Sequence, residues 1–225
     1  MINWYVKIFP CLLSLCLVQS VSDNQYSMAY ATHQLLCRLI FGTKFTELID
    51  IALMTNEGVI LNKQLCPNKL LKRLTILLRT IDDLLVLLDG LVPNLTELHI
   101  TLCTTRASRQ ILLPFEWSNF PMSYLTKFRL TTNENVEMRS EYLFPIVKLL
   151  TQLNTFTLDV KRWTSKDNTM SVCSNVRELI VDVPCSDLTR RSPNINTLAV
   201  LCKCKLDACN FPRLRRLITT NIEVV

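Results

Sequence analysis

The sequence predicts an α/β solenoid, a chain of strand, turn and helix units that stack on one another. One apolar motif recurs about every 25 residues along the 225-residue chain. Between copies of the motif, the apolar spacing changes from alternation to the period of a helix. The three glycines, Gly42, Gly58 and Gly90, are too few for the tight turns of a hairpin-rich all-β fold.

Composition narrows the possible classes of protein. Hydrophobic residues make up 49% of the chain and charged residues 20%, which excludes a disordered chain. The scarcity of glycine also excludes the glycine-rich turns that bind dinucleotides and phosphates in many enzymes. Because the motif recurs almost from end to end, we expect a single irregular domain over residues 1–225, with about nine repeats.

The motif is an apolar residue, two variable residues, an apolar residue, one variable residue and an apolar residue. Its two clearest copies match the leucine-rich-repeat template through the Asn or Cys that ends it. Less regular copies begin at Leu12, near Phe45, and at Leu71, Leu153, Val176, Ile195 and Leu214. The clear copies are Leu95, Leu98, Ile100 and Cys103, and Leu125, Phe128, Leu130 and Asn133.

The first copy has two interpretations. The apolar run that follows Lys7 fits a repeat strand with motif residues from Leu12 to Leu17, and we favour this interpretation. The run, with the small residues Ser20 and Ser22 after it, is also typical of a secretory signal peptide. A signal peptide would be cut near these serines, whereas a repeat strand leaves the amino terminus intact. No membrane span is expected, because the run is shorter than the roughly 20 residues that a spanning helix needs.

One helix is expected after the strand that begins at Leu71. Thr80 suits the cap of this helix, and Asp82 and Asp83 suit its first turn, where carboxylates are favourable. Apolar residues then continue at helical spacing to Leu91. We assign the adjacent carboxylates to the helix start and not to acid-base chemistry, since neighbours on a helix do not share a face.

Other elements are less regular. Residues 26–40 and 140–150 are expected to form helices, the second with Pro145 in or near its first turn. If the second repeat begins near Phe45, Asp50 falls at its third apolar position, and a strand shifted to use Ile49 and Ile51 is the alternative. The predicted fold is a leucine-rich-repeat solenoid with a parallel strand layer on the concave side and irregular helices on the convex side.

Prolines introduce several copies of the motif, as in Pro93-Asn94-Leu95. These irregular repeats resemble the substrate-binding half of F-box/leucine-rich-repeat proteins over residues 8–222. The resemblance implies a protein-recognition region of a ubiquitin-ligase adaptor. The helical F-box that precedes the repeats in that family is not visible here, so we expect the chain to be truncated at its amino end.

Few residues indicate catalysis or metal binding. The two histidines, His33 and His99, lie outside known catalytic motifs. The densest thiol cluster, Cys202, Cys204 and Cys209, lacks the fourth ligand of a structural zinc site. We therefore expect no enzymatic activity, no metal and no cofactor.

The variable positions of the strands are the candidate binding residues, because alternation places them on the concave face. Their mixed charge suits a protein or peptide ligand. The candidates are Glu97, His99, Thr101, Lys127, Arg129, Thr131, Thr157, Asp159, Arg177 and Asp182.

Basic residues gather in the C-terminal repeats, within a chain of net charge +6. This region is expected to suit an acidic partner. Aromatic residues do not alternate with the basic ones, so no nucleic acid is expected. The basic residues are Arg190, Arg191, Lys203, Lys205, Arg213, Arg215 and Arg216.

The sequence thus predicts a non-enzymatic protein-interaction module that serves as the substrate-recognition region of an F-box-like ubiquitin-ligase adaptor. Most of the ten cysteines lie in apolar runs, as buried thiols do, which favours a cytoplasmic or nuclear location. The alternative is a secreted or cell-surface leucine-rich-repeat recognition protein, with residues 1–20 as a signal peptide.

Overall fold

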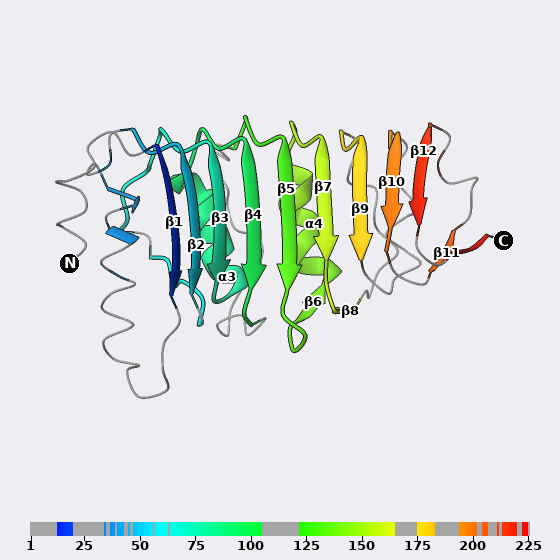
Figure 1. Cartoon of the computed structure of the whole chain (residues 1–225), viewed down its shortest axis with the longest axis horizontal. Coiled ribbons are helices and arrows are strands. Elements are labelled where there is room, and N and C mark those ends of the chain that lie inside the picture. Colours follow the sequence, from blue (N-terminus) through cyan, green and yellow to red (C-terminus); the bar gives the residue numbers. More distant parts are fainter. Residues whose placement is uncertain are drawn as a thin grey trace. The chain divides into compact units, whose positions relative to one another are not determined.

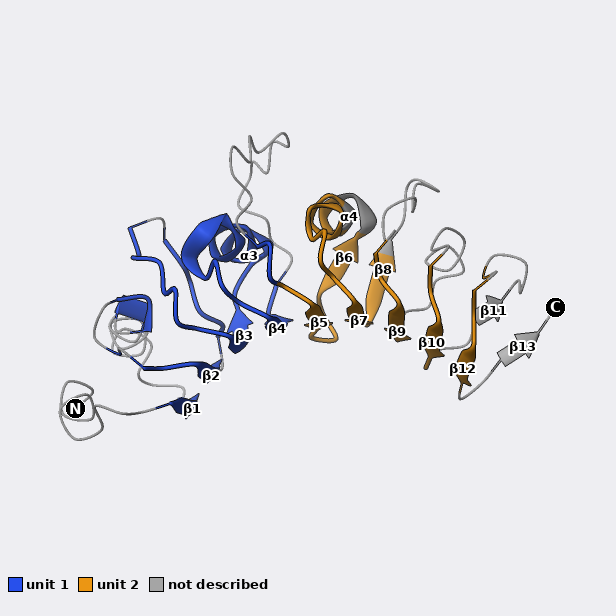
Figure 2. Ribbon diagram, turned by 90° about the horizontal axis from the view of Figure 1, so that it is seen from above, with its two compact units in different colours: residues 1–124 blue, residues 125–225 orange. Residues whose placement is uncertain are grey.

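The computed structural model has an α/β fold with mostly parallel strands (Figure 1). It forms two compact units, residues 1–124 and 125–225 (Figure 2). Leu12, Arg190, Arg191 and most of the helix expected at 26–40 lie outside the described residues. The described residues are 13–19, 34, 37–38, 40–42, 45, 47–55, 57–62, 64–104, 122–164, 175–182, 194–201, 204–206, 211, 213–219 and 222–224.

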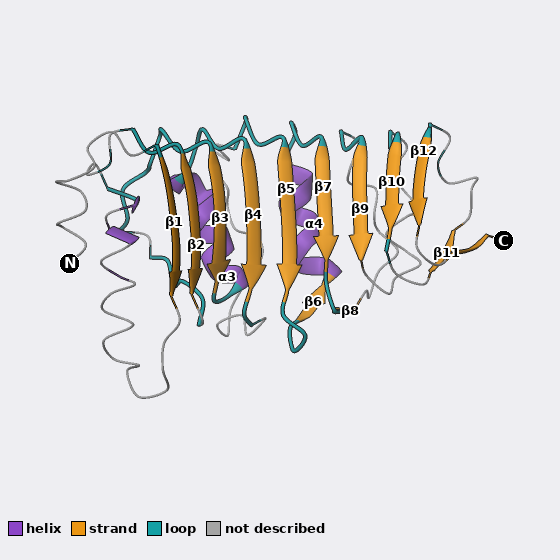
Figure 3. Ribbon diagram, viewed as in Figure 1, coloured by secondary structure: helices purple, strands orange, loops and turns teal. Residues whose placement is uncertain are grey.

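The first unit contains four parallel strands in the order β1-β2-β3-β4 (Figure 3). Equivalent motif residues stand opposite one another, so that Leu15, Ile51, Leu74 and Leu98 form one row across the strands. The helices of this unit lie on one side of the strands (Figure 2), and Ile51, Leu74 and Leu98 of this row are buried. The elements are β1 (Ser14–Gln19), β2 (Asp50–Thr55), β3 (Arg73–Leu78), α3 (Ile81–Val86), the π-helix η1 (Leu87–Leu91) and β4 (Glu97–Leu102).

The second unit contains five parallel strands in the order β5-β7-β9-β10-β12. Four short strands form two further parallel pairs, β6 with β8 and β11 with β13. In the chain, β6 follows β5, β8 follows β7, β11 follows β10 and β13 follows β12. The strands of the row are β5 (Lys127–Thr132), β7 (Thr155–Asp159), β9 (Glu178–Asp182), β10 (Thr197–Val200) and β12 (Arg216–Thr219). The remaining elements are β6 (Glu137–Arg139), α4 (Ser140–Leu149), β8 (Arg162–Thr164), β11 (Cys204–Leu206) and β13 (Ile222–Val224).

A single backbone pattern recurs where these strands begin. The N–H groups of Arg177 and Glu178 both donate to the carbonyl of Asn154, at 2.9 and 3.1 Å. The N–H groups of Asn196 and Thr197 then donate to the carbonyl of Arg177, at 2.8 and 3.1 Å. The same pattern, in which two successive N–H groups donate to one carbonyl, recurs at other strand starts. The donors and their acceptor are, for example, Lys72 and Arg73 to Ile49, Thr96 and Glu97 to Lys72, Asn154 and Thr155 to Thr126, and Arg215 and Arg216 to Asn196.

The motif leucines form the core, as the sequence predicts. Leu98 and Leu130 are 2% and 0% exposed. In the second unit, the rings of Phe128 and Phe156 stack with centroids 5.7 Å apart. Leu217 is an exception at 43% exposed, because its strand β12 has β10 on one side and no described strand on the other.

The second repeat begins three residues later than the position near Phe45 that the sequence favoured. Leu48, Ile51 and Leu53 are all 1% exposed or less, and they match the motif spacing. The alternative that used Ile49 and Ile51 is confirmed for Ile51, which is 0% exposed, and is wrong for Ile49, which is 38% exposed. Burial of alternate residues fixes this register, since a slip by one residue would expose the whole apolar set.

At the amino end, β1 pairs with β2 in the register expected of a repeat strand, with Leu17 opposite Leu53. Leu15 and Leu17 are only half-buried. Of the residues in the helix expected at 26–40, those that are described are helical, and Cys37 and Ile40 among them are buried. No helix within the described residues is long and apolar enough to span a membrane.

Thr80 caps α3 as predicted, and Asp83 completes the cap. The Thr80 hydroxyl and N–H donate to Asp83 Oδ2, at 2.6 and 2.9 Å, and the Asp83 N–H donates back to the hydroxyl at 3.3 Å. Asp83 is 5% exposed, and its Oδ1 accepts the N–H of Leu61 at 2.8 Å. Burial raises the pKa of Asp83, although these hydrogen bonds lower it. Asp83 thus joins α3 to a segment 22 residues earlier in the chain.

That segment lies along the end of β3. Val59 bridges to Leu78, and its N–H donates to the carbonyl of Leu77 at 2.7 Å. Gly58 before it has φ of +77°, and a Cβ there would lie 2.7 Å from backbone atoms of Arg79. Only glycine fits this close approach without strain.

The helix expected at 140–150 is present as α4, but Pro145 lies in its middle and not in or near its first turn. Because α4 begins at Ser140, as the predicted range does, Pro145 lies five residues after its first residue and therefore beyond the first turn of about 3.6 residues. Proline has no N–H to donate to the preceding turn, so α4 lacks one helical hydrogen bond at this point.

Four cysteines whose side chains are described, Cys16, Cys37, Cys66 and Cys103, are free thiols. Burial raises the pKa of Cys37 to about 12 and that of Cys103 to about 11. Cys16 and Cys66 are exposed. Thiol burial in this chain therefore differs from one repeat to another.

Leu98→Ala and Leu130→Ala should each lower the free energy of unfolding by about 2 to 5 kcal/mol, because each leaves a cavity in the strand core. Urea unfolding followed by circular dichroism measures this loss. The matched control is Leu70→Ala, at a side chain that is 46% exposed, with an expected change within about 0.5 kcal/mol. Equal losses at Leu98 and Leu70 would contradict the burial described here.

Asp83→Ala should lower the free energy of unfolding by about 2 to 4 kcal/mol, since it removes the cap and leaves the buried N–H of Leu61 without its acceptor. Asp82→Ala is the matched control, because it removes the neighbouring carboxylate from the same turn. Its expected cost is about 0.3 to 1 kcal/mol, from the lost interaction with the helix dipole. Similar costs for both variants would refute the linking role of Asp83.

Candidate binding site on the strand face

The candidate site is the outward side of the strands, where variable residues alternate with the buried leucines. We call this side the strand face. In the first unit it carries Glu97, His99 and Thr101 of β4, all half-buried. Glu97 lies opposite Arg73, which forms an ion pair with Asp50 at 2.9 Å. The strand face of this unit therefore carries a charged row, Asp50, Arg73 and Glu97, next to rows that mix polar residues such as His99 with apolar residues such as Ala52 and Leu77.

In the second unit the strand face changes in character from β5 to β12. Lys127 and Arg129 of β5 are exposed, and Thr131 is half-buried. Along the row of Arg129, the residues become less polar toward β12. That row is Arg129, Thr157, Ile180, Ala199 and Ile218, and the row of Lys127 is Lys127, Thr155, Glu178, Thr197 and Arg216.

A small charged cluster lies at the far end of β7 and β9. Thr131, Asp159 and Asp182 form one row, and the two carboxylates stand opposite each other. Lys161 bridges them, with Nζ 2.7 Å from Asp159 Oδ1 and 3.3 Å from Asp182 Oδ2. The hydrogen bond to Asp159 is the main cause that raises the pKa of Lys161. Lys161 was not among the predicted site residues, although it occupies the position where the motif template has Asn or Cys.

Arg177 does not lie on the strand face. The structure places it directly before β9, and Glu178 takes the face position opposite Thr155. The Thr155 hydroxyl donates to Glu178 Oε2 at 3.1 Å. The other predicted site residues of the second unit, Lys127, Arg129, Thr131, Thr157, Asp159 and Asp182, lie on the face as expected.

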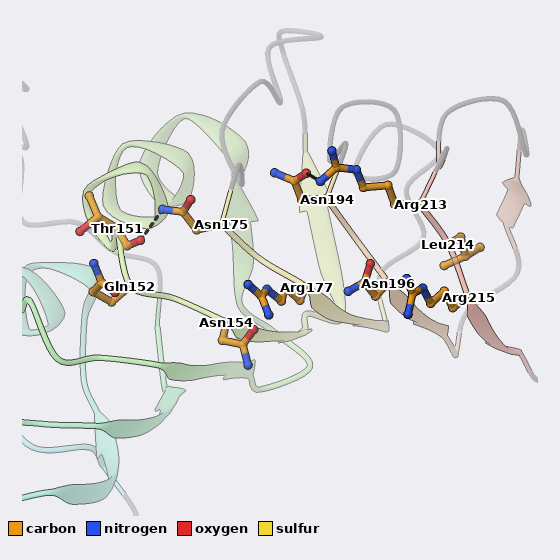
Figure 4. Close-up of a pocket in the computed structure, with 10 residues that line it drawn as sticks. All are labelled: Thr151, Gln152, Asn154, Asn175, Arg177, Asn194, Asn196, Arg213, Leu214 and Arg215. Carbon is orange, nitrogen blue, oxygen red and sulfur yellow. Dashed lines mark hydrogen bonds between the residues drawn. The ribbon is translucent and has the colours of Figure 1, made fainter.

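Arg177 instead lines a groove of about 1000 Å³ at the starts of β7, β9, β10 and β12 (Figure 4). Sequence reasoning missed this groove, although Asn or Gln recurs in the positions before the motif. One row, Asn154, Arg177, Asn196 and Arg215, directly precedes the strands. The other described residues that line the groove are Thr151, Gln152, Asn175, Asn194, Arg213 and Leu214.

The described residues show no arrangement typical of a metal site. No group of three or more His, Cys, Asp or Glu side chains within the described ranges is placed to hold a metal ion. Cys202 and Cys209 lie outside those ranges, and only the backbone of Cys204 is described, in β11. His99 is half-buried on the strand face.

No protein-family model matches the chain, and no curated protein is significantly similar to it. Its function is therefore inferred from its own residues and geometry.

Lys161→Gln should lower the free energy of unfolding by less than about 1 kcal/mol, because exposed ion pairs contribute little. The loss should shrink at about 1 M salt, which screens the repulsion between Asp159 and Asp182. Urea unfolding at low and high salt measures both effects. Adding Asp159→Asn to the variant removes one of the facing carboxylates and should recover stability at low salt. No recovery would show that Lys161 does not offset this repulsion.

Proposed function

We propose that the chain is a leucine-rich-repeat solenoid whose strand face recognises a protein or peptide. Support for the solenoid comes from equivalent motif residues that stand opposite one another within each unit. Further support is the strand-start hydrogen-bond pattern, which recurs in both units. In this proposal the strand face is the concave side and the helices are on the convex side, as in stacked repeats generally.

The observation that carries the binding proposal is the strand face of the second unit. It places exposed Lys127 and Arg129, the Asp159 and Asp182 carboxylates, and half-buried Ile180 on one continuous set of paired strands. A mixed polar and apolar surface of this kind suits a protein ligand better than a polyanion or a lipid. The proposed function is non-enzymatic and requires no metal or cofactor.

The resemblance to F-box/leucine-rich-repeat proteins suggests the biological setting. We propose that the chain is the substrate-recognition region of an F-box-like ubiquitin-ligase adaptor, located in the cytoplasm or nucleus. The position of β1 beside β2 supports the repeat-strand interpretation of residues 14–19. A secreted or cell-surface recognition protein, with a signal peptide in residues 1–20, is the alternative.

Peptides selected against the wild-type chain from a random library displayed on phage should bind the K127E/R129E variant on the order of tenfold more weakly. The reason is that this variant reverses both exposed charges of β5 on the strand face. Fluorescence anisotropy with the synthesised peptides measures the affinities, and circular dichroism confirms that each variant is folded.

The matched control is K148E/R162E, which reverses two exposed basic residues of the same unit, on α4 and β8. It should leave the affinities of the selected peptides unchanged. If the peptides bind K127E/R129E as tightly as the wild type, the strand face is not the recognition surface.

A further inference from the structure

The groove at the starts of the second unit's strands presents side chains at a fixed spacing. The N–H of Arg177 donates to Asn154, that of Asn196 to Arg177, and that of Arg215 to Asn196, all at 2.8 to 2.9 Å. Because each residue is bonded to its equivalent in the previous repeat, the row follows the spacing of parallel strands, about 4.8 Å. Figure 4 shows these side chains along the groove.

The groove is cationic. Arg177, Arg213 and Arg215 line it, and none of the described residues that line it is acidic. Arg213 donates to Asn194 Oδ1 at 2.8 Å. Arg177 and Arg215 are exposed, and neither forms an ion pair with an acidic side chain of the described ranges. Charge complementarity therefore favours an anionic ligand bound chiefly by these two arginines.

The spacing of the two arginines restricts the shape of that ligand. Arg177 and Arg215 precede β9 and β12, which pair with opposite edges of β10, so the two residues stand about 9.6 Å apart. A polyproline II helix places every third side chain on one face, at intervals of about 9.3 Å. A β-strand instead places side chains of one face about 6.7 or 13 Å apart. The arginines thus match carboxylates three residues apart on a polyproline II segment.

Asn196 lies between the two arginines in the same row. Its amide offers a donor and an acceptor, and a polyproline II backbone makes no hydrogen bonds of its own. Asn196 is therefore placed to bond the peptide group between two bound carboxylates. None of the described lining residues is aromatic, so the groove lacks the stacking surface that single-stranded nucleic acids use.

We propose that this groove binds an acidic segment of a partner protein in the polyproline II conformation. Arg177 and Arg215 bind acidic side chains at positions i and i+3 of that segment, and Asn196 bonds the backbone between them. The site is separate from the strand face and does not depend on the function proposed for that face.

The test is fluorescence anisotropy with a labelled peptide of Glu-Pro-Pro repeats, in which each glutamate is three residues from the next. The full chain should bind this peptide, and the R177Q/R215Q variant should bind it on the order of tenfold more weakly. The matched control K148Q/R162Q, which also removes two exposed charges of the second unit, should bind it as the wild type does. Circular dichroism establishes that both variants are folded.

A second peptide of the same composition, built from Glu-Pro-Glu-Pro-Pro-Pro repeats, contains no pair of glutamates three residues apart and should bind more weakly. Equal binding of the two peptides would overturn the proposal in favour of diffuse electrostatic attraction. An oligouridylate that binds as tightly, with the same loss in R177Q/R215Q, would overturn it in favour of nucleic acid. Absence of peptide binding, or an equal loss in the control variant, would also overturn it.

K127E/R129E should bind the Glu-Pro-Pro peptide as the wild type does. A loss in that variant would place the peptide on the strand face and overturn the groove proposal. Failure of this proposal is thereby distinguishable from failure of the function proposed for the strand face.

Discussion

The structure depends on the alignment of equivalent residues in successive repeats. Before most of the strands, the carbonyl of one residue accepts two N–H groups of the next repeat, as that of Asn154 does from Arg177 and Glu178. This bond pair fixes the register before the strand begins. Once the register is fixed, the leucines stack into one core row and the variable residues stack into surface rows. The same backbone hydrogen bonds therefore align both the buried leucines and the variable surface residues.

The core could be predicted from the sequence because its signal is periodic and local. Leu98 and Leu130 are recognisable from three apolar residues at fixed spacing, and repeat length does not affect that spacing. Contacts between repeats were harder to predict. Thr155 lies opposite Glu178, 23 residues later, whereas Glu178 lies opposite Thr197, only 19 residues later. With irregular steps, the sequence does not show which surface side chains meet.

The placement of Arg177 shows that the sequence does not distinguish two adjacent polar residues that lie on different surfaces. Two variable residues separate the first two apolar positions of the motif, and both look equally polar in the sequence. In the structure only the second, Glu178, belongs to the strand face, while the first lies in the groove. The adjacent residues Arg215 and Arg216 separate in the same way, since Arg216 pairs within β12 and Arg215 lines the groove. A basic run in the sequence therefore divides between the strand face and the groove.

For Asp83, the sequence predicts the position in the first turn of α3 but not the hydrogen bond to the distant residue Leu61. Its place in the first turn of α3 follows from Thr80 three residues earlier, whereas its bond to the N–H of Leu61 depends on how the preceding segment returns to β3. Three donors favour the carboxylate, but burial raises the pKa above its ordinary value of 3.8. The folded state thus binds this proton more tightly than the unfolded state, so protonation of Asp83 adds to stability below pH 3.8, and this added stability is lost as the pH rises through the folded-state pKa. The same buried position that lets Asp83 join two segments makes its charge costly, and its hydrogen bonds offset part of that cost.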